Sequence, residues 1–346
     1  MPLRKYVFRP GINKEGTNYS NEGGWFDADK VRFRKGRPER IGGWQKQSTN
    51  SFIGTSRKIY SYRAASGTNY ITLGTHQKFY VLEGQEYADI TPIRNTTSAG
   101  DITFAATNGS STITATDTSH GAVAGDFVTF SGAASLGGNI TATVLNQEYQ
   151  IDAVPNSDTF TFTATATANS SDTGNGGSSI VGVYQLNSGL DSYVSSTGWG
   201  AGTWGAGTWG STTALSFANQ LRLWSIDNFG DDTVLNPRAG GLFYWDESSG
   251  TGTRAVNVTT KAGASDVPTI ALQTMVSDVD RHVITFGCNP VGSSTLDPLL
   301  VRFSDTESIT DWTPTATNQA GGVQLSMGST IIGALQTRQE ILIWTD

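Results

Sequence analysis

Short apolar and aromatic stretches, separated by polar turns, recur along the chain and predict an all-β protein. Residues 57–64, 69–75 and 78–84 are rich in Tyr, Ile, Val and Phe, and residues 87–93 follow them after another turn. β-branched and aromatic residues between Gly, Ser or Asn turns are typical of strands. Three or four antiparallel strands within about 40 residues have the size of one β-propeller blade or a quarter of a sandwich.

Residues 97–179 show a cleaner alternation of apolar and polar positions. The predicted strands are 111–116, 126–132, 139–145, 148–154 and 158–168. In the last of these, Phe160 and Phe162 share one face and the threonines share the other, which is typical of a half-buried strand. Strands like those before residue 97 resume after residue 179. We therefore predict that residues 97–179 form a small β-sandwich-like module inserted into a loop of a larger domain.

Strands of the first kind resume near residue 215 and continue to the last residue. They are predicted at 215–227, 241–247, 253–258, 281–287, 299–305, 321–328, 330–336 and 340–346. Their recurrence predicts further propeller blades. We therefore divide the chain into 1–96 (a docking segment and the first propeller strands), 97–179 (the inserted module) and 180–346 (a Trp/Gly loop and further blades). Because 340–346 is a strand with no closing turn, we expect a longer polypeptide or another chain to complete its sheet.

The composition agrees with an all-β fold and argues against a disulfide-stabilised or membrane-spanning protein. The 346 residues include 41 Gly, and only 15% are charged, which suits many turns and a surface rich in hydroxyl and amide groups. The single cysteine, Cys288, lies in an apolar run and is expected to be buried, so no disulfide forms within the chain. No apolar run approaches the length of a membrane-spanning helix, and we expect no membrane insertion.

Positive charge is concentrated at the start of the chain. Residues 1–63 hold 14 Lys and Arg against 5 Asp and Glu, whereas the whole chain has a net charge of −7. The densest cluster consists of Lys30, Arg32, Arg34, Lys35, Arg37 and Arg40. A strand over 31–34 would place Val31 and Phe33 on one face and bases on the other. Such a face is either merely solvated or contacts an acidic protein or a nucleic-acid backbone.

A Trp/Gly segment at 198–213 is the second candidate contact. Trp199, Trp204 and Trp209 recur every five residues among many glycines, which fits neither a helix nor one strand face. The segment is predicted to be a loop. Its Trp rings either pack into the neighbouring domain or contact a partner.

No catalytic, cofactor or metal site is predicted. The three histidines, His76, His120 and His282, lie far apart in the sequence, and Asp227, Asp231 and Asp232 lack the spacing of a calcium loop. Residues 303–312 loosely resemble the Asp-box turn of sialidase-like propellers, without the glycine that this turn expects. We therefore expect a protein that is not an enzyme and has no cofactor.

The opening stretch carries a family resemblance. FRPGINKEGTNYSNEGGWFDADKVRFRKGRPERIGGW, residues 8–44, resembles the start of the tail nozzle proteins of short-tailed bacteriophages (podoviruses), also called tail tubular protein B or DNA-stabilising tail hub proteins. RFSDTESITDWTP, WGAGTWGAGTWG and the terminal ILIWTD are similar to marine versions, and 97–179 is similar to small β-domains inserted into phage structural proteins.

The resemblance implies a structural protein of the virion tail. Nozzle subunits form a homohexameric ring below the portal and adaptor, each with a β-propeller, and viral DNA leaves through the channel between them. Tail fibres or spikes attach near the junction of adaptor and nozzle. The basic cluster would then contact another subunit or the adaptor. An acidic chain agrees with a conduit, since tight phosphate binding would stall DNA.

Two other classes of function remain open at this point. The same hairpins and Trp loop could form a carbohydrate-binding or glycan-hydrolysing propeller in a receptor-binding tail protein. Residues 97–179 alone would suffice for an adhesion or capsid-decorating β-module.

Overall fold

The chain forms two compact units, residues 1–49 and residues 50–346. The computed structural model describes residues 8–17, 19–43, 45–46, 48–192, 221–338 and 340–346. The predicted first segment, 1–96, thus includes the whole first unit and the beginning of the second.

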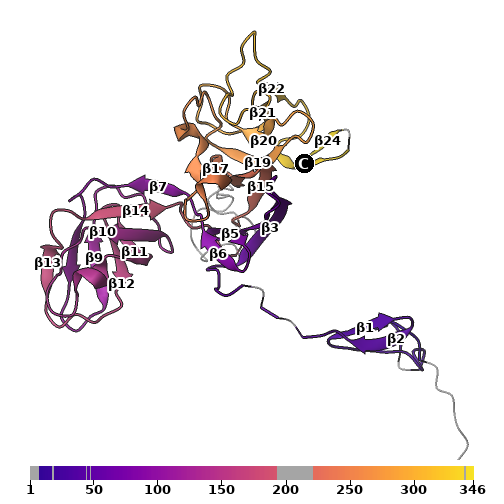
Figure 1. Cartoon of the computed structure of the whole chain (residues 1–346), viewed down its shortest axis with the longest axis horizontal. Coiled ribbons are helices and arrows are strands. Elements are labelled where there is room, and N and C mark those ends of the chain that lie inside the picture. The colour runs from indigo at the N-terminus through magenta and orange to yellow at the C-terminus, as the bar shows by residue number, and fades with distance from the viewer. Residues whose placement is uncertain (1–7, 18, 44, 47, 193–220, 339) are drawn as a thin grey trace, which may run out of the picture. The chain divides into compact units, whose positions relative to one another are not determined.

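The first unit is built around one β-hairpin (Figure 1). Strand β1 (Val31–Arg34) pairs antiparallel with β2 (Arg37–Arg40), and Lys35 and Gly36 form the turn between them. Both turn residues have positive φ, 50° and 75°, which is the geometry of a type I′ hairpin turn. Val31 and Phe33 are half-buried while Arg32 and Arg34 are exposed, so the predicted alternation of the two faces is confirmed.

The described residues of the second unit form three four-stranded antiparallel sheets, each made of consecutive strands. The first comprises β3 (Ser56–Arg63), β4 (Asn69–Thr75), β5 (Phe79–Glu83) and β6 (Glu86–Asp89). The second comprises β15 (Trp224–Phe229), β16 (Asp232–Pro237), β17 (Phe243–Trp245) and β18 (Val256–Asn257). The third comprises β19 (Ala271–Val276), β20 (Val283–Cys288), β21 (Asp297–Phe303) and β22 (Gly321–Gln324). The hairpin of β23 (Ile331–Gln336) and β24 (Ile341–Thr345) follows.

These sheets pack face to face in chain order, with the first strand of each beside the first strand of the next. β3 contacts β15, β15 contacts β19, and β19 contacts β23. Aromatic residues such as Phe79 and Trp245 fill the core between the first and second sheets, and Trp312 lies in the core between the second and third. Serial four-stranded sheets around a common line of inner strands are the blades of a propeller-type fold. The predicted all-β, propeller-type architecture is therefore confirmed.

The inserted module lies between the first and second blades in the chain and is one curled eight-stranded sheet (Figure 1). Its strands are β7 (Ile93–Thr96), β8 (Thr103–Ala106), β9 (Thr112–Thr116), β10 (Phe127–Ser131), β11 (Glu148–Asn156), β12 (Thr159–Thr163), β13 (Asp172–Asn175) and β14 (Val181–Gln185). The long strand β11 pairs with β10 on one side and with β12 on the other. Its register shifts at Ala153. The sheet thereby curls over a core that includes Phe104, Phe130 and Phe162.

One strand prediction is wrong. Residues 139–145 were predicted to form a strand from their β-branched residues, but Ala142–Leu145 form the short helix α1. The Thr141 side chain accepts a hydrogen bond from the Val144 N–H group, which caps the helix, and Leu145 is fully buried. Local capping and the burial of one leucine outweigh strand propensity here. The described residues also include two 3₁₀ turns, η2 (Glu247–Ser249) and η3 (Val258–Thr260).

Candidate functional site

The β1–β2 hairpin gathers all six residues of the predicted basic cluster. Arg32 Nε lies 3.2 Å from Glu39 Oε2, and Lys30 Nζ lies 3.8 Å from Asp29 Oδ2. The other four, Arg34, Lys35, Arg37 and Arg40, make no ion pair with any residue that the structure describes. The register places Arg34 directly opposite Arg37. Like charges in that position are unfavourable, so an anion bound there would stabilise the hairpin.

The hairpin tip is concave. Arg34, Lys35, Arg37 and Glu39 line a cavity of about 430 Å³. Arginine presents planar, bidentate donors that fit carboxylate and phosphate groups. The tip can therefore receive an acidic side chain or a phosphate.

The rest of the first unit has the composition of a contact surface. Trp25 contacts the rings of Phe8 and Phe33, at centroid distances of 5.7 and 6.2 Å. No hydrophobic residue in the described part of this unit is fully buried, and Phe8, Tyr19 and Phe26 are exposed. Exposed aromatic residues beside arginines are typical of the centres of protein interfaces.

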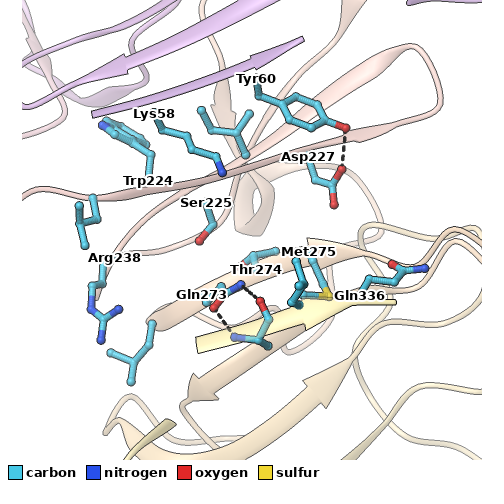
Figure 2. A pocket seen from close by; sticks show the side chains of 15 residues that line it. Lys58, Tyr60, Trp224, Ser225, Asp227, Arg238, Gln273, Thr274, Met275 and Gln336 are labelled. Carbon is cyan, nitrogen blue, oxygen red and sulfur yellow. Dashed lines mark hydrogen bonds between the residues drawn. The ribbon is translucent and has the colours of Figure 1, made fainter. Parts of the chain in front are cut away.

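The inner strands of the blades enclose a second candidate site (Figure 2). A pocket of about 410 Å³ lies among β3, β15, β19 and β23. Tyr60 from β3 donates a hydrogen bond to Asp227 Oδ1 at 2.9 Å, and Asp227 Oδ2 accepts the Val276 N–H group at 2.9 Å. Gln273 bonds to both backbone groups of Ala334, which ties β19 to β23. This axial pocket is thus framed by hydrogen bonds between neighbouring blades.

The charged groups of the axial pocket are Lys58, Asp227 and Arg238. Burial raises the pKa of the Asp227 carboxyl, and burial together with the Asp227 charge raises the pKa of Tyr60 above its ordinary value. Protein donors occupy both oxygens of Asp227, so this residue acts as a joint between three blades. Among the lining residues that the structure describes, it is the single carboxylate, whereas glycoside hydrolysis normally uses a pair.

A buried charge network joins the first blade, the module and the segment before β18. Lys78 Nζ lies 2.8 Å from Asp89 Oδ2 and 2.5 Å from Glu148 Oε1, and its side chain is 3% exposed. Arg254 Nη1 donates to Asp89 Oδ1 at 2.9 Å, and Gln185 Nε2 donates to Glu148. Burial alone would raise the pKa of Asp89, but Lys78 and Arg254 outweigh it and hold that pKa below its ordinary value. We call Lys78, Asp89, Glu148 and Arg254 the junction network.

Sequence reasoning missed the junction network entirely. Lys78 and Asp89 belong to the same blade, but Glu148 and Arg254 are far from them in the sequence, and none of the four stands in a recognisable motif. They meet only in the folded chain. Folding brings together the turn before β5, the end of β6 and the start of β11. No local sequence signal could have identified it.

The other residues that the sequence singled out are the tryptophans of the Trp/Gly segment and the aspartates near residue 231. Trp199, Trp204 and Trp209 lie outside the described residues, so their predicted contact role stays a prediction. Asp231 Oδ1 accepts the Ala65 N–H group, and Asp232 accepts the Tyr244 hydroxyl and the Glu247 N–H group. Among the described residues, no three His, Cys, Asp or Glu side chains are grouped so as to hold a metal ion.

The turn at 303–312 and Cys288 have structural roles. Asp305 Oδ1 accepts the Gln319 N–H group at 2.8 Å, while Trp312 is fully buried and its Nε1 donates to the Ile309 carbonyl at 2.8 Å. Cys288 is buried, as predicted, and burial raises the pKa of its thiol. In the part of the chain that the structure describes, no helix has the length and apolar character needed to span a bilayer.

Comparison with known proteins gives no family. Neither a family model nor a curated protein matches the chain. Among solved structures, the chain is similar to one described as phage phi92 endosialidase, with 13% identity and a TM-score of 0.26. The match covers 89% of this chain and 43% of that chain, so this chain spans less than half the length of the endosialidase it matches. At this TM-score the likeness carries no argument about function.

Proposed function

We propose that this chain is a structural protein of a bacteriophage tail, and that it forms a nozzle ring below the portal and adaptor. The observation that carries the proposal is the opening stretch, residues 8–44, with its resemblance to the start of podovirus tail nozzle proteins. Within that stretch the structure has a hairpin whose exposed face is basic and largely unpaired. A propeller-type body agrees with the same family.

In this account the hairpin holds the ring together or docks it onto the adaptor. Arg34, Lys35, Arg37 and Arg40 contact carboxylates of a neighbouring subunit or of an adaptor protein. The channel itself carries DNA without binding it. A chain with a net charge of −7 and no Lys or Arg between Arg94 and Arg222 meets this requirement. Low phosphate affinity lets the genome be retained and then ejected without stalling. Tail fibres or spikes attach beside the ring.

Electron microscopy of the purified protein together with its native particle tests this proposal. A six-fold ring of propeller-sized lobes on the tail axis, below the adaptor, is the expected result. A peripheral trimer, or no density for this protein on the axis, would contradict it.

The axial pocket supports a second candidate, a receptor-binding tail protein that binds glycans. Lys58 and Arg238 present donors at its wall, which suits a hydroxylated or acidic sugar. Glycan-array binding that is lost in Arg238→Ala and kept in the hairpin variant Arg37→Ala would favour this candidate. No binding to any host polysaccharide would reject it.

A further inference from the structure

The axial pocket extends to one side of the Tyr60–Asp227 bond, and polar side chains line it there. Side chains two residues apart in a strand share a face, so Lys58 lies on the face of Tyr60 in β3 and Ser225 on the face of Asp227 in β15. Figure 2 shows Lys58 and Ser225 to the left of the Tyr60–Asp227 bond. Thr274 of β19 lines the same pocket. Three blades thus supply one ammonium group and two hydroxyls to this part of the pocket.

The two cations of the axial pocket lack a carboxylate partner. Neither Lys58 nor Arg238 makes an ion pair with any residue that the structure describes. The Asp227 carboxylate accepts hydrogen bonds from Tyr60 and from the Val276 N–H group instead. Arg238 is half-buried, and burial lowers the pKa of its guanidinium group. A partly buried cation without a counter-ion is unfavourable, so an anion bound beside Arg238 would stabilise it.

The Thr274 hydroxyl is a second and independent sign of a ligand. Thr274 is 5% exposed, and its Oγ1 has no hydrogen-bond partner among the residues that the structure describes. Buried hydroxyl groups are nearly always hydrogen-bonded, because an unpaired one costs free energy. An oxygen atom of a ligand in the pocket would supply the missing acceptor.

We infer that the axial pocket is an oxyanion site, which holds a phosphate or carboxylate group of a small ligand between Lys58 and Arg238. Ammonium and guanidinium groups both form strong, charge-assisted hydrogen bonds to these oxyanions. Ser225 and Thr274 donate to the remaining oxygens. A volume of about 410 Å³ suits a ligand larger than a bare ion, such as a sugar acid or a sugar phosphate. Apolar lining residues, among them Leu223, pack on its carbon skeleton.

This oxyanion site goes beyond the nozzle proposal and does not rest on it. For the glycan candidate it specifies that the pocket holds the sugar by an anionic group. Neutral and acidic sugars therefore distinguish the two ideas, because a glycan site without an oxyanion site would bind both.

Isothermal titration calorimetry at fixed ionic strength tests the site with sodium phosphate, glucuronate and glucose as probes. Every chain carries Arg37→Met, so that phosphate bound at the hairpin tip does not contribute. At least one of the two anions should bind, and glucose should not. Lys58→Met and Arg238→Met should each weaken anion binding by roughly tenfold or more, since each removes a charge-assisted hydrogen bond.

Arg338→Met is the matched control for these two variants. Arg338 is an exposed cation outside the pocket, in the turn between β23 and β24. Its substitution should change anion binding by less than about twofold, because the interactions of exposed charges are weak. Thermal melts of all variants show that they are folded.

Thr274→Val tests the buried hydroxyl through two readouts. The change keeps the shape of the side chain and removes Oγ1. Anion binding should weaken by about threefold or more, because one hydrogen bond to the ligand is lost. The melting temperature of the free chain should not fall, since the hydroxyl has no partner among the described residues. A lower melting temperature with unchanged anion binding would mean that the hydroxyl has a structural role only, and it would contradict the inference.

The pattern of binding decides the inference and identifies the ligand. Binding of phosphate alone would indicate a phosphate ligand, and a preference for glucuronate would indicate an acidic sugar; either result supports the site. The inference is overturned if neither anion binds, or if anion binding is the same in Lys58→Met, Arg238→Met and Arg338→Met. Glucose binding that needs neither cation would overturn it too, while leaving the glycan candidate in place.

Discussion

Cationic side chains have opposite environments in the junction network and in the β1–β2 hairpin. Lys78 is almost fully buried and lies within 2.8 Å of two carboxylates, Asp89 and Glu148. Arg34 and Arg37 are exposed, face each other across the hairpin, and pair with no carboxylate of the described chain. A buried ion pair is needed for the stability of the fold that contains it, because removing one partner leaves the other charge buried and uncompensated. An exposed and unpaired one contributes little to folding and remains available to a partner.

The largest expected effect comes from breaking the junction network. Lys78→Met keeps the side-chain length but leaves Asp89 and Glu148 without their shared cation. We expect the free energy of unfolding to fall by roughly 3–5 kcal/mol, as for other buried pairs that lose one member. Urea denaturation measures it. Arg34→Met is the matched control and should change the free energy of unfolding by less than about 0.5 kcal/mol. Equal losses in the two variants would remove the distinction between the two sets of cations.

A smaller loss of stability is expected from neutralising Glu148, the residue that the inserted module contributes to the junction network. Glu148→Gln retains the shape of the side chain and removes the charge that Lys78 and Arg254 face. The free energy of unfolding should fall by about 1–3 kcal/mol, because a charge-assisted bond is lost and Lys78 keeps only Asp89. Asp152→Asn, an exposed acid on the same strand, serves as the control in the same urea titration. A Glu148→Gln chain as stable as Asp152→Asn would show that the module does not depend on this network.

Acid should weaken the same network. The pKa of Asp89 in the folded chain lies below its unfolded value, so the unfolded chain binds more protons between the two values. The stability from Asp89 is therefore fully present above the unfolded pKa and is lost as pH falls through the folded pKa. Urea titrations from pH 6 down to pH 3 should show a steeper loss in the wild type than in Asp89→Asn. Parallel curves would contradict this role of Asp89.

The smallest effect on stability, and the largest on assembly, is expected at the hairpin. Reversing charge in Arg34→Glu with Arg37→Glu should leave the free energy of unfolding within about 0.5 kcal/mol of the wild type. If the proposed function holds, the same variant should fail to join the proposed ring or to dock on the adaptor, because carboxylates would face carboxylates. Incorporation into particles, scored by electron microscopy, measures this. Normal incorporation would exclude the hairpin as the docking surface.

Sequence patterns predicted the repeated strands of this molecule well. They predicted poorly the contacts between residues that are distant in the sequence. The strand predicted at 69–75 forms with those bounds, and the strand predicted at 158–168 forms over Thr159–Thr163 only. Both follow from their own residues, because alternation and β-branched side chains act locally. The 139–145 stretch has the same residue types, yet a Thr141 cap and a buried Leu145 make it helical. The basic hairpin was visible because its charges are contiguous. The junction network and the Tyr60–Asp227 joint were not, since their members meet only after the blades pack.

Hydrogen exchange of the free protein and of the protein in its native particle tests the central contrast most directly. The amides of β5 and of β11, which flank the junction network, should be protected in both states. The amides of the 31–40 hairpin should exchange readily in the free protein and become protected only in the particle. Hairpin amides that are equally protected in the free protein, or that stay unprotected in the particle, would contradict the claim that its unpaired cations serve a partner.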